Sequence, residues 1–254
     1  RFHVEQEKTP NWMKYPPLLQ FYQQVREAGV ELEPDPDFLE DPKLGRYLEN
    51  QLKNLELSQS VKDFLMNVGL PDQFRPFRLP SDEKSGKHVY LGTMFWVSCL
   101  RNEAVNKKKY LVIGESRGFS PIVFTSEREM PDGAKEKIWN YFKGEHVSYE
   151  VVELKTGSVW TWYHDSYGDE LSFVNSSLEQ YLLSMAYWQS FYRDFSQKIE
   201  GYLKKNKDKR EWEYVDRNRK RLYAPFIECI KILDPPALRK RMTIWKRLTD
   251  ISLI

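Results

Sequence analysis

One serine of the chain, Ser116, lies in a motif that hydrolases use for nucleophilic catalysis. Residues 114–118 spell G-E-S-R-G, a literal G-x-S-x-G that follows a run of strand-forming residues. In α/β-hydrolases this motif makes a sharp turn that presents the serine at the start of a helix. Here residues 119–124 are again typical of a strand, and Pro121 disfavours a helix. We therefore predict a hairpin whose glycines adopt turn dihedral angles, with Ser116 not catalytic.

The metal-ligating residue types are too scattered to form a recognisable zinc site. The four histidines are His3, His88, His146 and His164. None of them forms an H-x-x-x-H pair, and Cys99 and Cys229 are far apart in apolar runs, as is typical of buried free thiols. A polar segment, residues 164–170, could hold a metal or be a solvated turn. Because glycine-rich phosphate-binding motifs are also absent from the sequence, we expect no cofactor.

The C-terminal part of the chain is basic, which raises the alternative of a nucleic-acid partner. From residue 198 onward there are 16 Lys and Arg against 8 Asp and Glu, whereas the whole chain has a net charge of +2. Basic clusters at residues 204–210 and 217–221 flank Trp212 and Tyr214, a composition that can grip phosphates and stack bases. Acidic residues are interspersed, so the exposed face of a helix is the competing interpretation.

Aromatic residues are concentrated in the segment Trp160-Thr161-Trp162-Tyr163. In a strand, alternate residues face opposite sides, so Trp160 and Trp162 share one face and Thr161 and Tyr163 share the other. Tryptophan and tyrosine serve both cores and protein interfaces. Core packing and partner binding therefore remain two open interpretations of this segment.

The segments around these residues predict an antiparallel sheet. Short runs rich in β-branched and aromatic residues, separated by turns, cover residues 88–100, 109–114, 121–125, 147–154, 158–164 and 171–174. Helices do not alternate with these runs, which excludes a doubly wound fold. We predict an α+β fold with a mostly antiparallel sheet of about six strands flanked by helices.

Helical patterns precede and follow the sheet. Apolar spacing predicts a helix over residues 18–25 that ends at Gly29, a short helix over 44–52, and a third helix capped by Ser58 or Ser60. After the sheet, a long amphipathic helix covers 178–199, and further helices cover 226–233 and 235–248. A capping box, with Glu179 bonded to the Ser176 backbone, is expected to start the long helix. Asp234 is expected to cap the last helix, with Pro235 at its first position.

These elements divide the chain into a helical N-terminal extension, residues 1–56, and an α+β domain, residues 57–254. Hydrophobic residues make up 41% of the 254 and charged residues 30%, an ordinary globular balance. Apolar runs stay shorter than the roughly 18 residues of a membrane span. Two cysteines form no disulfide framework, so we expect a cytoplasmic protein without a membrane partner.

Five segments, in order, resemble those of the SUKH (SMI/KNR-like) superfamily over about residues 58–254. The matching segments are the helix with its GLP ending at 64–71, the strands at 110–114 and 157–160, the NSSLEQY start of a helix at 175–181, and the LDP run at 232–235 with Trp245. The last segment resembles the fourth SUKH family. The resemblance implies an immunity protein of the toxin–antitoxin kind that binds a cognate toxin, often a nuclease, and is not an enzyme. Its alternative implication is an adaptor or scaffold module in a defence or signalling complex.

For such a protein we expect the partner to contact the aromatic hairpin and the loop that follows it. The predicted partner-binding residues are Trp162, Tyr163, His164, Tyr167 and Asp169. Their rings match the residue types that dominate interface energetics, and their polar tips stay compatible with water.

Overall fold

A computed structural model describes most of the chain. The described residues are 11–35, 44–71, 73–74, 93–105, 108–129, 135–165, 168–206, 211–239, 243 and 245. Predictions for residues 75–92, 166–167 and 246–254 fall outside them. Side chains are described in the helices and in the central part of the sheet.

The N-terminal helices pack on the same core as the rest of the chain. They are the 3-10 helix η2 (Asn11–Lys14), α1 (Pro16–Glu27), α2 (Glu49–Leu52) and α3 (Gln59–Asn67). Leu18 and Val25 of α1 are fully buried, and Tyr15 packs edge-on against Phe64 of α3 at 6.1 Å between ring centroids. The division at residue 56 stays a prediction, although the described part of 1–56 shares this core.

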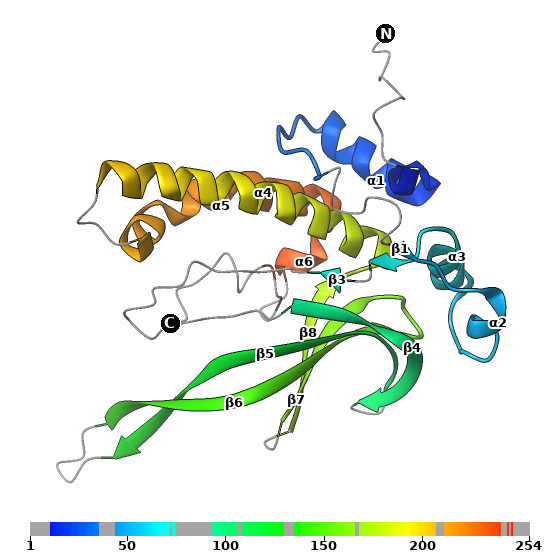
Figure 1. The fold of residues 1–254 in the computed structure, drawn as a ribbon, viewed down its shortest axis with the longest axis horizontal. Coiled ribbons are helices and arrows are strands. Elements are labelled where there is room, and N and C mark those ends of the chain that lie inside the picture. Colours follow the sequence, from blue (N-terminus) through cyan, green and yellow to red (C-terminus); the bar gives the residue numbers. More distant parts are fainter. Residues whose placement is uncertain are drawn as a thin grey trace.

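The named strands of the sheet pair antiparallel. In spatial order they are β3 (Gln73–Phe74), β4 (Thr93–Val105), β5 (Lys108–Glu129), β6 (Lys135–Glu153), β7 (Val159–Asp165) and β8 (Gly168–Asn175). Strand β8 also forms one parallel bridge, between Phe173 and Thr243. A separate short pair joins β1 (Leu44–Gly45) to β2 (Leu70–Pro71). Strands β5 to β8 form the continuous part that positions the predicted site, and helices lie on one side of it (Figure 1). The predicted α+β class and antiparallel sheet with flanking helices are confirmed.

Two long helices, α4 (Leu178–Lys205) and α5 (Glu211–Leu233), supply most of the aromatic core; the short α6 (Pro236–Arg239) follows. Trp188 of α4 contacts Phe226 of α5 at 4.9 Å and Trp245 at 6.0 Å between ring centroids. Trp188, Phe226 and Trp245 are each at most 1% exposed. Trp245 therefore packs as part of the fold, as predicted. The helix predicted over 235–248 is not confirmed, since α6 covers only 236–239 and Thr243 forms a parallel bridge with Phe173.

A buried hydrogen-bond network joins the end of β8, the start of α4 and the end of α5. The Asp234 carboxylate accepts bonds from the Asn175 side-chain amide at 2.9 Å and from the Ser176 hydroxyl at 2.7 Å. The Ser176 backbone N–H also donates to it at 2.8 Å. The Trp245 indole N–H donates to the Asn175 side-chain oxygen at 3.1 Å. Since Asp234, Asn175 and Trp245 are fully buried, each of these bonds replaces one lost to water.

Two predicted helix starts are corrected by the structure. Ser177, not Ser176, caps α4 and accepts a bond from the Gln180 N–H at 3.2 Å. The predicted capping box with Glu179 is wrong because the Ser176 N–H is bonded to Asp234 instead. The predicted start of the last helix is also displaced, because α6 begins at Pro236 and Pro235 is therefore not at its first position.

Other helix boundaries were predicted more accurately. Ser58 caps α3, and Gly29 and Gly69 follow their helices with φ of 77° and 85°, a region that favours glycine. The short helix predicted over 44–52 covers only α2, because residues 44–45 pair with β2. The helix predicted over 226–233 begins earlier, since α5 starts at residue 211.

The predicted hairpin at residues 114–118 is wrong. These residues lie inside β5, which continues unbroken to Glu129. Ser116 is paired with Met94 of β4 on one side and with Ser148 of β6 on the other. Strand partners on both sides hold the backbone extended, so the glycines make no turn here. The prediction that Ser116 is not at a strand–helix elbow agrees with this continuous strand.

Candidate partner-binding site

The β7–β8 hairpin contains the predicted partner-binding residues. Trp162, Tyr163 and His164 lie on β7, and the register places His164 opposite Asp169 of β8. Tyr167 lies outside the described residues. Of the five, only Trp162 has a described side chain, so Tyr163, His164 and Asp169 are located here by their backbone alone.

Trp162 and Trp160 share one face of the sheet, as the alternation predicted. Both pack on a small buried cluster formed by Tyr110, Val112 and Val151. Trp160 also packs against the main core, where its ring lies 5.2 Å from that of Phe173. Trp162 also contacts the Tyr149 ring, with 5.1 Å between centroids and an interplanar angle of 36°. We call the half-buried residues Tyr149, Trp160, Trp162 and Leu171 the aromatic face.

The opposite face of the same strands is closed against the helices. Thr161 lies between the two tryptophans in sequence, is 2% exposed, and donates a hydrogen bond to the Glu150 carboxylate at 2.7 Å. The register aligns Glu150, Thr161 and Ser172 in one row across β6, β7 and β8. The second carboxylate oxygen of Glu150 and the Ser172 hydroxyl are buried without a hydrogen-bond partner. This row is therefore part of the interior.

Burial strongly affects the ionisation of Glu150. Removal from water raises its pKa to about 8, although the hydrogen bond from Thr161 acts in the opposite direction. Near neutral pH a protonated carboxyl is therefore favoured at this position. Glu150 was not predicted from the sequence, because the pattern alone does not distinguish a buried glutamate in a strand from a surface one.

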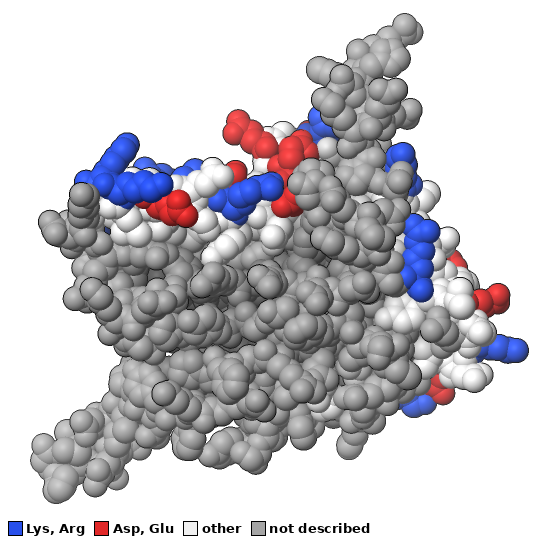
Figure 2. Space-filling view, in the orientation of Figure 1, with Lys and Arg blue, Asp and Glu red and all other residues white. Residues whose placement is uncertain are grey.

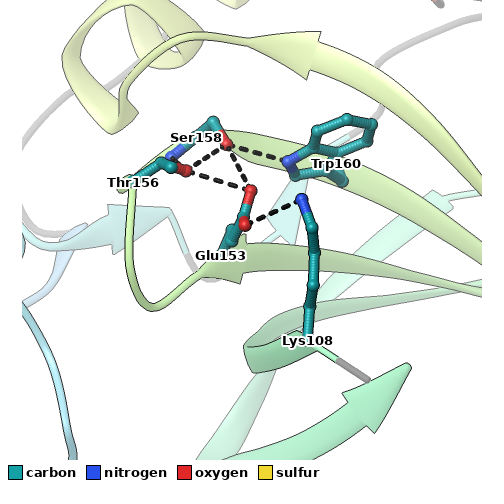
Figure 3. Close-up of polar contacts among 5 residues, drawn as sticks. All are labelled: Lys108, Glu153, Thr156, Ser158 and Trp160. Atoms are coloured by element: carbon teal, nitrogen blue, oxygen red, sulfur yellow. Dashed lines mark hydrogen bonds and ion pairs between the residues drawn. The ribbon is translucent and has the colours of Figure 1, made fainter. Parts of the chain in front are cut away.

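A polar network beside the aromatic face fixes the orientation of Trp160 (Figure 3). The Trp160 indole N–H donates to the Ser158 hydroxyl at 2.8 Å, and Ser158 lies within 2.7 Å of the Thr156 hydroxyl. Lys108 forms an ion pair with Glu153 at 2.9 Å, and its ammonium lies 5.8 Å from the centre of the Trp160 ring. A lysine over an indole face adds a cation–π attraction.

The charge of Glu153 is stabilised within this network. Its side chain is only 7% exposed, and burial alone would raise its pKa. The hydrogen bonds and charge of Lys108, with the hydroxyls of Thr156 and Ser158, instead hold the pKa of Glu153 below its usual value. The turn that carries these hydroxyls needs Gly157, whose φ is 73°. The ionised form of Glu153 is therefore favoured, and the turn at Gly157 fixes the hydroxyls that bond to it.

The basic C-terminal surface belongs to the helices, whereas the aromatic face belongs to the sheet. Figure 2 shows Lys and Arg gathered where α4 ends and α5 begins, together with acidic side chains. Lys204, Lys205 and Arg221 are exposed there. Tyr214 stacks on Tyr202 with 4.0 Å between centroids, so it joins the two helices. That contact leaves Tyr214 unsuited to the base stacking considered from sequence.

Two further functional classes find no support in the described part of the chain. Within it, no three His, Cys, Asp or Glu are grouped to hold a metal ion. The same residues include no helix long and apolar enough to cross a membrane.

Comparison with known proteins identifies the family. The family model for the SUKH-4 immunity protein matches residues 27–250, which confirms the resemblance seen in the sequence and starts upstream of it. No curated protein and no solved structure matches the chain. Since the family match spans most of its 254 residues, the chain belongs to the SUKH-4 immunity protein family.

Proposed function

We propose that this chain neutralises a cognate protein toxin by binding it directly. The family suggests the toxin-neutralising role. The observation that supports binding through the sheet is the aromatic face, where Tyr149, Trp160 and Trp162 stay half-buried while the opposite side of the same strands is closed. Partly exposed tryptophans on a fixed scaffold are the residue type that most often contributes large binding energies.

The proposed contact surface combines the aromatic face with the β7–β8 hairpin. Trp162, Tyr163, His164, Tyr167 and Asp169 remain our proposed partner-binding residues. The Trp160 indole is held by Ser158 and faces Lys108, so its orientation is set before a partner arrives. Preorganised contacts lower the entropy cost of association. Binding of this kind needs no cofactor and no catalytic residue.

We infer that the toxin is blocked by coverage of its surface and not by imitation of a nucleic acid. Imitation requires a dense array of carboxylates, whereas Lys204, Lys205 and Arg221 make the surface where α4 meets α5 basic. A nuclease toxin, the class implied by the superfamily resemblance, would thus be inhibited at or beside its active site by the aromatic surface.

The test uses a toxin domain found encoded beside the gene for this chain; an immunity protein is expected to have one there. Co-expression with the intact chain is expected to restore growth to cells producing that toxin, and calorimetry on the purified proteins is expected to give a one-to-one complex. Neither protection nor binding would contradict the immunity role. Binding without protection would favour the adaptor alternative.

A double variant locates the interface within this complex. Tyr163→Ala with Tyr167→Ala is expected to weaken toxin binding by about 2 kcal/mol or more, while the melting temperature stays close to that of the parent. An affinity equal to the parent's, with the fold intact, would place the toxin elsewhere.

A further inference from the structure

The two longest strands extend beyond the rest of the sheet. Among the described residues, β4 pairs with β5 only as far as Arg117, and β7 pairs with β6 only as far as Ser148. From Gly118 and His146 onward, the pairings between described residues join β5 and β6 only to each other, ending at Glu129 and Lys135. We call these paired segments, 118–129 and 135–146, the arm; it projects away from the helices (Figure 1).

The arm is long for a hairpin of two strands. At about 3.4 Å per residue, each strand of the arm spans roughly 40 Å. A two-stranded hairpin alone is marginally stable in water, because neither of its faces is covered by a second layer. A partner that covers the arm would remove this deficit.

The sequence of the arm has the composition of an interface, with an apolar middle and a charged end. Five consecutive register pairs, from Ile122–Phe142 to Ser126–Ile138, contain no charged residue. This uncharged band includes Phe124, Trp139 and Tyr141. Aromatic residues enriched at the centre and charges at the rim are typical of protein–protein contacts.

The end of the arm carries charges that complement one another across the strands. The register places Glu127 opposite Lys137, Arg128 opposite Glu136, and Glu129 opposite Lys135. Opposite charges at facing positions stabilise strand pairing and keep the arm close to neutral. A nearly neutral aromatic arm fits an apolar groove of a protein better than a nucleic acid, whose binding relies on an excess of Lys and Arg.

The root of the arm is continuous with the proposed interface. The last pair between β6 and β7 is Ser148 with Tyr163, so the arm leaves the sheet where β7, from His164 onward, pairs only with β8. The arm and the β7–β8 hairpin therefore diverge from one point, as two prongs (Figure 1). A partner seated on the hairpin is within reach of the arm.

We propose that the arm is a docking element that enters an apolar groove of the toxin, with the uncharged band as its central contact. This inference rests on the proposed function, since it takes the toxin as the occupant. Trp139 and Tyr141 are the expected main contributors, and the charged pairs at the end form the rim.

The experiment compares full-length variants in calorimetric titrations with the toxin domain encoded beside the gene. Trp139→Ala with Tyr141→Ala is expected to weaken binding by about 100-fold or more, with a melting temperature within a few degrees of the parent's. The matched control is Glu129→Gln with Lys135→Gln, which removes one rim pair from the same arm. The control is expected to change affinity by less than about threefold.

Hydrogen exchange on the unaltered chain gives a second measurement that does not depend on a variant folding. Addition of the toxin is expected to slow amide exchange in residues 118–129 and 135–146. Unchanged exchange there, or unchanged affinity in the aromatic double variant, would overturn the inference about the arm. In that case toxin binding by the parent would still support the immunity role. A parent that fails to bind the toxin would refute the immunity role itself. A concentration-dependent dimer that only the aromatic variant loses would assign the arm to a second copy of the chain and also overturn the inference.

Discussion

The two sides of the sheet differ in how completely the chain covers them. On the helix side, Trp188 and Trp245 are at most 1% exposed, and polar groups such as Asn175 are bonded within the interior. On the other side, Trp160 and Trp162 are half-buried over a cluster of three buried residues, and Trp160 also contacts Phe173 of the main core. The same residue type therefore stabilises the fold on one side and remains accessible to a partner on the other. Substitutions on the two sides should separate stability from binding.

The largest effect on stability is expected for Trp245→Ala. The substitution removes a fully buried indole that contacts Trp188 and Phe226 and leaves the Asn175 oxygen without its donor. Loss of packing of this kind costs about 3–5 kcal/mol. Denaturant unfolding would measure the loss, and an unchanged midpoint would show that the C-terminal segment does not support the core.

The next largest effect is a dependence of stability on pH through Glu150. Its pKa of about 8 in the folded chain exceeds the ordinary value of 4.5. Between these values the unfolded chain releases a proton that the folded chain keeps, so the free energy of unfolding falls as pH rises. From pH 4.5 to 7 the expected loss is about 3 kcal/mol.

Glu150→Gln isolates this contribution, because the amide does not titrate. The difference in the free energy of unfolding between parent and variant is expected to shift in favour of the variant between pH 4.5 and 8. A difference that stays constant over this range would show that Glu150 is ionised at its ordinary pKa.

A smaller effect is expected for Lys108→Met at the edge of the aromatic face. Glu153 would lose its ion pair but keep the hydroxyls of Thr156 and Ser158, so its pKa should rise and stability at pH 7 should fall by about 1 kcal/mol. Lys109→Met is the matched control, since Lys109 pairs with an exposed Glu56. The control is expected to change stability by less than about 0.5 kcal/mol. Equal effects of both changes would mean that the buried position of Glu153 has no energetic consequence.

The sequence predicted well those features that depend only on neighbouring residues, such as helix ends and the alternation of side chains in a strand. The helix ends at Gly29 and Gly69, the Ser58 cap and the shared face of Trp160 and Trp162 all follow from short-range geometry. The α+β class and the antiparallel sheet followed from strand periodicity without intervening helices.

Features that depend on distant residues were missed. The cap of α4 moved to Ser177 because Asp234, 58 residues away, bonds to Ser176. Residues 114–118 became the middle of β5 because strands on both sides pair with them, which outweighs the local preference of glycine for turns. Glu150 and the Lys108–Glu153 pair likewise depend on burial, which sequence spacing does not reveal.

The central claim is that the toxin binds the aromatic face together with the β7–β8 hairpin. Calorimetric titration of the Trp162→Ala variant with the neighbouring toxin domain tests it most directly, alongside a melting curve. Because Trp162 is half-buried, its removal is expected to cost only about 1 kcal/mol of stability while weakening toxin binding by about 30-fold or more. Parental affinity in a folded Trp162→Ala variant would contradict the account.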